Sequence, residues 1–135
     1  MKKSTALKGA LGSVLAVVAG GAIAPAPAEA AYACKTGEVC FYYDWSFRGT
    51  AAVIAGFNYS GAKVNDFRNF SYTNGKNLND SASSVKNLTN FTLYVYEHGT
   101  WGGKVTAVGP GVWEDFVAAP ETPLPNDTAS SAQLR

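Results

Sequence analysis

The chain has 135 residues, 13% of them aromatic, with 11 lysines and arginines against 10 aspartates and glutamates. This near-neutral balance, without a basic cluster, excludes a nucleic acid or an anionic membrane surface as a charge-driven partner. Ions, proteins or neutral polymers remain as partners.

Residues 1–30 have the composition of a secretory signal peptide. A start with three lysines precedes an apolar run over residues 10–24, and Ala28-Glu29-Ala30 is a small-residue cleavage site. The run is shorter than the roughly 20 residues of a membrane span. We therefore expect a secreted, extracellular protein whose residues 31–135 form a single domain. A second small-residue site at residues 31–33 leaves the cut open by a few residues.

The two cysteines, Cys34 and Cys40, follow soon after this leader. An even number of cysteines in an exported chain favours a disulfide, because two thiolates alone do not complete a zinc shell. Closing so short a loop stabilises a fold by about 2 to 2.5 kcal/mol.

Next come two predicted strands, Val39–Tyr43 and Ala51–Ile54, on either side of a turn at Gly49. Tyr42 and Phe47 precede this glycine with fixed spacing. A hairpin that folds back sharply over a sheet needs a residue with positive φ, and we expect Gly49 to supply it.

The same pattern returns 54 residues later as Tyr96, Trp101 and Gly103. Its predicted strands are Phe91–Tyr96 and Val105–Val108, and a further short strand is predicted over Val112–Val117. No segment after the leader has a sustained helical period of apolar residues. The sequence therefore predicts an all-β sandwich.

Two similar hexapeptides, at residues 79–84 and 126–131, lie 47 residues apart. The difference between the two offsets places seven extra residues in the first repeat, in a stretch that includes turn sequences at residues 58–61 and 72–76. Each hexapeptide combines amide, carboxylate and hydroxyl oxygens, which are ligands for a hard cation such as Ca²⁺.

Catalytic patterns are weak in comparison. The one histidine, His98, lies in the second predicted hairpin without a second histidine or a nucleophile motif, and the adjacent Glu114 and Asp115 would diverge on a strand. We expect a protein that is not an enzyme.

The doubled hairpin and hexapeptide resemble the calcium-binding microbial βγ-crystallin domain. The resemblance implies two Greek-key motifs, at about residues 38–88 and 91–135, that form a sandwich of two four-stranded sheets. It also implies a double clamp for two Ca²⁺ ions, formed by the paired hexapeptides. The metal ligands that it implies are the hydroxyls of Ser83 and Ser130, the carbonyls of Ser81 and Thr128, and side chains from the pairs Asn79–Asp80 and Asn126–Asp127.

Within each Asx pair, the member that reaches the ion stays open. A further carbonyl is possible near Glu38 and near residues 90–92. We expect Ser84 and Ser131 to hold their loops by hydrogen bonds and not to bind metal.

The segment Cys34–Cys40, which leads directly into Phe41, resembles the start of the secreted bacterial metalloproteinase inhibitors, which share this fold. The chain departs from them in having one cysteine pair. Two functions follow: a secreted calcium-binding protein stabilised by its ions, or a proteinaceous inhibitor of a secreted metalloprotease. An extracellular toxin or antifungal module is a third class that no residue supports or excludes. We expect a monomer.

Overall fold

The structure is a computed structural model that describes residues 30–116 and 124–135. The predicted signal peptide, apart from Ala30, and the last residue of the predicted strand at 112–117 lie outside these residues. The described strands and 3₁₀ turns are β2 (Val39–Asp44), η2 (Trp45–Phe47), β3 (Arg48–Val53), β4 (Lys63–Val64), η3 (Phe67–Asn69), β5 (Ser84–Asn87), β6 (Leu93–His98), β7 (Gly102–Val108), β8 (Trp113–Asp115) and β9 (Ser131–Leu134).

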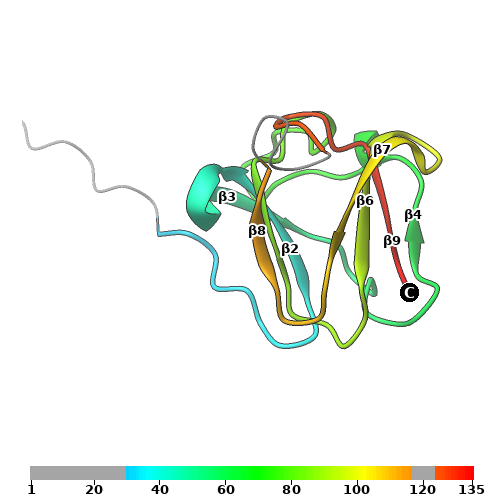
Figure 1. The fold of residues 1–135 in the computed structure, drawn as a ribbon. Helices are drawn as coiled ribbons and strands as arrows, with labels where there is room; N and C mark the ends of the chain where they lie inside the picture. The colour runs from blue at the N-terminus through cyan, green and yellow to red at the C-terminus, as the bar shows by residue number, and fades with distance from the viewer. Residues whose placement is uncertain (1–29, 117–123) are drawn as a thin grey trace, which may run out of the picture.

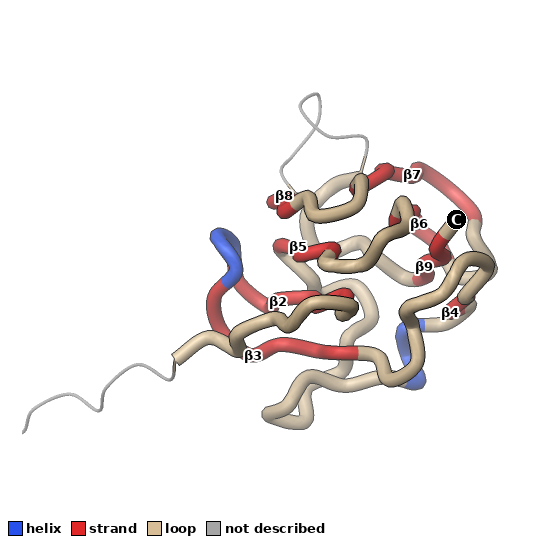
Figure 2. Tube along the Cα trace, turned by 90° about the horizontal axis from the view of Figure 1, so that it is seen from below, coloured by secondary structure: helices blue, strands red, loops and turns tan. Residues whose placement is uncertain are grey.

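These strands form two four-stranded antiparallel sheets, with orders β3-β2-β5-β8 and β4-β9-β6-β7. Figure 1 shows the sheets standing side by side, and Figure 2 shows the same layers from below. Each repeat gives its third strand to the other sheet, β4 to the second and β8 to the first. The two orders are therefore related by exchange of the repeats, and the predicted all-β sandwich of two four-stranded sheets is confirmed.

The long aromatic strands match the sequence prediction, and the short ones differ from it. The strand predicted at residues 112–117 is described as only Trp113–Asp115, and the prediction contained no strand at Lys63–Val64, which pairs with β9 over two residues. In the described ranges the helical segments are the two 3₁₀ turns, and no helix there has the length and apolar character to cross a membrane.

The core lies between the sheets, because alternate residues of each strand point inward. Phe41 and Val85 face it from the first sheet and Val95 from the second, all fully buried. Phe67, from turn η3, packs edge-on against Phe41 with ring centroids 5.1 Å apart. This packing fixes the loops at one end of the sandwich.

The predicted glycine turns are present in both repeats. Gly49 and Gly103 each have φ of 75°, and an added Cβ would lie 2.5 Å from Asp44 Oδ2 at the first and 2.6 Å from His98 Cδ2 at the second. The corners also contain left-handed residues that are not glycine, including Phe47 with φ of 60°. Such strain persists only where surrounding contacts hold the turn.

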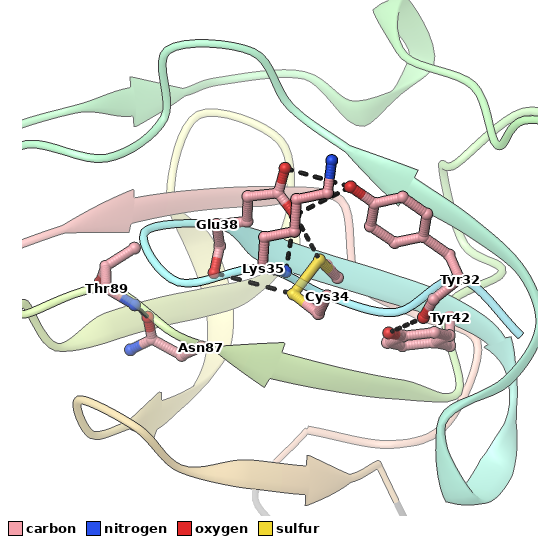
Figure 3. Close-up of a disulfide and its surroundings, with 8 residues drawn as sticks. Tyr32, Cys34, Lys35, Glu38, Tyr42, Asn87 and Thr89 are labelled. Atoms are coloured by element: carbon pink, nitrogen blue, oxygen red, sulfur yellow. Dashed lines mark hydrogen bonds between the residues drawn. A yellow bond between two sulfur atoms is a disulfide. The ribbon is translucent and has the colours of Figure 1, made fainter.

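The disulfide between Cys34 and Cys40 is confirmed, with Cα atoms 6.0 Å apart. It holds the N-terminal segment against β2, as Figure 3 shows. Tyr42 donates a hydrogen bond to the Tyr32 carbonyl at 2.7 Å, and Tyr32 donates to the Glu38 carboxylate at 3.0 Å. The bond to Glu38 raises the pKa of the Tyr32 hydroxyl.

Candidate functional site

The two hexapeptides lie against each other at one end of the sandwich (Figure 1). The Asp80 N–H donates to the Ala129 carbonyl at 3.0 Å, and the Asp127 N–H donates to the Ala82 carbonyl at 3.3 Å. Both aspartates have positive φ, 53° and 58°, a conformation that costs free energy in a residue with a Cβ. The reciprocal bonds hold both turns in this conformation.

The side chains are exchanged in the same reciprocal way. The Ser83 hydroxyl donates to Asp127 Oδ1 at 3.2 Å, and the Ser130 hydroxyl donates to Asp80 Oδ1 at 2.8 Å. Each pair therefore joins a hydroxyl from one repeat with a carboxylate from the other. We call this arrangement of residues 79–84 and 126–131 the clamp.

A hollow lies on each side of the clamp. The small hollow, about 210 Å³, contains the Ser83–Asp127 pair, and its lining is Tyr43, Asp44, Asp80, Ser81, Ser83 and Asp127. The large hollow, about 450 Å³, contains the Ser130–Asp80 pair. Its lining is Asp66, Arg68, Asn79, Asp80, Glu97, His98, Gly99, Asp127, Thr128 and Ser130.

The last serine of each hexapeptide bonds the adjacent hairpin turn, at residues 44–49 or 98–103, and does not bond the opposite hexapeptide. Ser84, which is fully buried, donates to the Asp44 carbonyl at 2.7 Å and accepts from the Phe47 N–H at 3.0 Å. Ser131 repeats this arrangement, with the His98 carbonyl at 2.6 Å and the Trp101 N–H at 3.0 Å. The hydrogen-bonding role predicted for both serines is confirmed.

The other clamp residues occupy distinct positions. The side-chain oxygen of Asn126 accepts a hydrogen bond from the Trp45 indole at 3.0 Å, whereas Asn79 lines the large hollow. The Ser81 hydroxyl donates to carbonyls of its own loop, and the Thr128 hydroxyl donates to the Pro125 carbonyl at 2.7 Å. In both Asx pairs the aspartate is the member that reaches across to the opposite serine.

The structure does not bring the residues near Glu38 or residues 90–92 to the clamp. Glu38 precedes β2 and lies beside the disulfide, whereas the small hollow is reached from the other end of β2, at Asp44. Likewise, Glu97 lies toward the end of β6 and lines the large hollow. Asp44 and Glu97 were not among the residues predicted from the sequence. Each lies within two residues of the repeated tyrosine, Tyr42 or Tyr96. Because β2 pairs with β5 so that Tyr42 lies opposite Ser84, this spacing could have placed Asp44 near the first hexapeptide.

An ion pair borders the large hollow. Arg68 bonds the Asp66 carboxylate through Nε and Nη2, the latter at 2.8 Å, and its hydrogen bonds lower the pKa of Asp66. The Phe67 N–H between them donates to the Ser130 carbonyl at 2.9 Å. Turn η3 is thus fastened to the second hexapeptide.

The chemistry of the clamp suits a hard divalent cation. Each hollow is lined by a serine of the reciprocal pairs and by the aspartates of both repeats, and the large hollow also contains Arg68, which is paired with Asp66. The candidate ligands are therefore mainly oxygens. Both aspartates are exposed, which leaves their carboxylates accessible from solvent. The residues present therefore fit Ca²⁺, and His98, whose side chain is 68% exposed, adds a nitrogen at the edge of the large hollow only.

Comparison with solved structures supports the fold. A structure from work on the evolution of the eye-lens βγ-crystallin domain fold is 24% identical and covers 84% of this chain and 93% of its own, with a TM-score of 0.56. A βγ-crystallin domain from Flavobacterium johnsoniae is 18% identical, covering 72% and 92%, with a TM-score of 0.50. A mutant βγ-crystallin domain from Clostridium beijerinckii is 20% identical, covering 72% and 95%, with a TM-score of 0.50. These similarities establish the βγ-crystallin fold.

Comparison of sequences gives a family. The model of peptidase inhibitor family I36 matches residues 27–108, which include the disulfide, the first hexapeptide and strands β2 to β7. The second hexapeptide lies outside the match. A search of curated proteins found no match.

Proposed function

The chain belongs to peptidase inhibitor family I36, and we propose that it is an exported, monomeric protein, not an enzyme, whose βγ-crystallin fold is stabilised by Ca²⁺ bound at the clamp. The reciprocal Ser83–Asp127 and Ser130–Asp80 pairs carry this proposal. Hydroxyl and carboxylate oxygens already lie together on each side, although they come from different repeats.

In the small hollow, the proposed ligands are the Ser83 hydroxyl, the Asp127 carboxylate and the Ser81 carbonyl. In the large hollow they are the Ser130 hydroxyl, the Asp80 carboxylate and the Thr128 carbonyl. The side chains of Asn79 and Asn126 support these ligands. Asn79 lines the large hollow, and Asn126 accepts a hydrogen bond from the Trp45 indole. With one carboxylate from the Asx pairs assigned to each ion, we expect dissociation constants of about 0.1 to 1 mM, as in extracellular modules.

Binding to the folded state alone raises its stability. At a free Ca²⁺ concentration of about 100 times the dissociation constant, each site adds about 2.7 kcal/mol. For a domain of this size, that corresponds to a rise in Tm of about 10 °C or more. Calcium thus fastens the two repeats to each other, because each ion takes ligands from both.

The test is thermal unfolding in EDTA and in about 10 mM Ca²⁺. We expect Ca²⁺ to raise the Tm of the unchanged protein and Mg²⁺ to raise it less, since Mg²⁺ dehydrates reluctantly. Ser83→Ala combined with Ser130→Ala should abolish the Ca²⁺-dependent rise, and the exposed Ser60→Ala should retain it. A double variant that still responds to Ca²⁺ would show that the ligands are misplaced.

Family membership favours a second property, inhibition of a peptidase, and the sequence resemblance specifies a secreted metalloprotease. The matched region includes the disulfide, which fastens the N-terminal segment and so limits the entropy lost when a partner binds. We expect stoichiometric loss of activity when the protein is titrated into a thermolysin-like enzyme in Ca²⁺-containing buffer. Full activity at micromolar protein would exclude that enzyme class as the target.

A further inference from the structure

The first repeat contains an ordered turn in the stretch between Gly49 and Asn79, which is seven residues longer than its counterpart in the second repeat. Ser71 and Asn77 form an antiparallel bridge, and inside it the Tyr72 N–H donates to the Lys76 carbonyl at 2.9 Å. The Thr73 N–H donates to the Ala51 carbonyl of β3 at 3.0 Å. Segment 71–77, which we call the buttress, is therefore fixed to the edge of the first sheet.

The side chain of Tyr72 points from the buttress into the protein, where it is 2% exposed. Its hydroxyl lies 3.0 Å from the Ser81 hydroxyl, and its ring packs edge-on against Tyr43 at 5.6 Å. Ser81 and Tyr43 both line the small hollow. One buried side chain thus contacts two separate parts of the wall of that hollow.

The direction of the hydrogen bond follows from its surroundings. The Ser81 hydroxyl lies 2.9 Å from the carbonyls of both Asn77 and Leu78, so its single proton is directed to them. The Tyr72 hydroxyl is then the donor to the Ser81 oxygen.

In the second repeat, the turn that corresponds to the Ser81 turn makes a different hydrogen bond. Thr128, the counterpart of Ser81, donates to the Pro125 carbonyl within its own loop at 2.7 Å. The segment between Gly103 and Asn126 is seven residues shorter than that between Gly49 and Asn79. The large hollow also has about twice the volume of the small one, about 450 against 210 Å³.

We infer that Tyr72 is a positioning residue for the ion of the small hollow, where it holds the Ser81 turn and the Tyr43 backbone in place, and that the two calcium sites are therefore not equivalent. This inference rests on the proposed function. The small hollow is the better ordered site and binds its ion more tightly. Tyr72 touches no ion itself, and it acts through Ser81 and Tyr43.

The test is calorimetric titration of Ca²⁺ into the calcium-free protein and its Tyr72→Phe variant. Loss of one hydrogen bond behind the site should weaken one of the two ions by about tenfold and leave the other within about twofold. Tyr42→Phe is the matched control, because it removes the hydroxyl of another buried tyrosine, whose bond at 2.7 Å goes to Tyr32 on the outer face of the sheet. It should lower the Tm and leave both affinities unchanged.

Single-site backgrounds assign the effect. In Ser130→Ala, which retains the small hollow, Tyr72→Phe should reduce the remaining affinity, and in Ser83→Ala it should not. Equal weakening of both ions, or unchanged binding by Tyr72→Phe, would overturn this inference and leave the proposed function standing. Absence of Ca²⁺ binding by the unchanged protein would overturn both.

Discussion

The corner held by Ser84 gives the sharpest prediction about stability. Its hydroxyl is fully buried, donates to the Asp44 carbonyl at 2.7 Å and accepts from the Phe47 N–H at 3.0 Å. Ser84→Ala removes both bonds and leaves the Phe47 N–H and the Asp44 carbonyl, which meet the serine in a part-buried position, without their partner. Two lost bonds, together with the desolvation cost of the groups left behind, amount to about 2 to 3 kcal/mol.

For a domain of this size, the loss corresponds to a fall in Tm of roughly 10 to 20 °C. The strained Phe47, with φ of 60°, also loses the bond that its N–H makes, one of the contacts that hold its conformation. The assay is calorimetry in EDTA, so that calcium does not contribute. Ser60→Ala, at an exposed loop position, is the control and should stay within about 1 °C. Equal melting temperatures for the two variants would refute the role given to Ser84.

Two further predictions concern the disulfide and a half-buried carboxylate. Replacing Cys34 and Cys40 together by alanine should lower the free energy of unfolding by about 2 to 2.5 kcal/mol in urea titrations, and an unchanged value would contradict the role of the bridge. Burial raises the pKa of Glu114, so the folded state binds its proton more tightly than the unfolded state and loses stability as pH rises above the ordinary glutamate pKa. Glu114→Gln should therefore raise the Tm at pH 7, with the gain disappearing near pH 3.5, and an equal gain at both pH values would point to another cause.

The glycine corners could be predicted from sequence because one steric requirement governs them. The spacing from Tyr42 to Gly49 and from Tyr96 to Gly103 places each glycine where the hairpin folds back, and both have φ of 75°. The same spacing did not indicate that Phe47 would also be left-handed. The Phe47 N–H donates a hydrogen bond to the hydroxyl of Ser84, which is distant in sequence.

Strand β5 shows more clearly what the local sequence cannot predict. Two of its four residues, Ser84 and Asn87, are polar and fully buried, and a third polar residue, Lys86, is partly buried. The Asn87 side chain donates to three backbone carbonyls, those of Phe91, Val108 and Gly109. Local propensity does not reveal a strand whose polar groups are satisfied by tertiary contacts.

The pairing of the hexapeptides came from the resemblance and the repeat, whereas their neighbours required the structure. Asp44 and Glu97 line the hollows because β2 and β6 run to the clamp at their C-terminal ends. The sequence places Tyr72 in a turn but does not indicate which residues its side chain contacts. Its burial against Tyr43 and Ser81 depends on how that turn folds onto β3.

In the proposed function, the clamp binds calcium with oxygens from both repeats. The most direct measurement is isothermal titration calorimetry of Ca²⁺ into the calcium-free protein, with the stoichiometry read from the isotherm. Two ions per chain in the unchanged protein, and none in the combined Ser83→Ala and Ser130→Ala variant, is the predicted result. No heat of binding at millimolar Ca²⁺, or the same isotherm in the double variant, would contradict it.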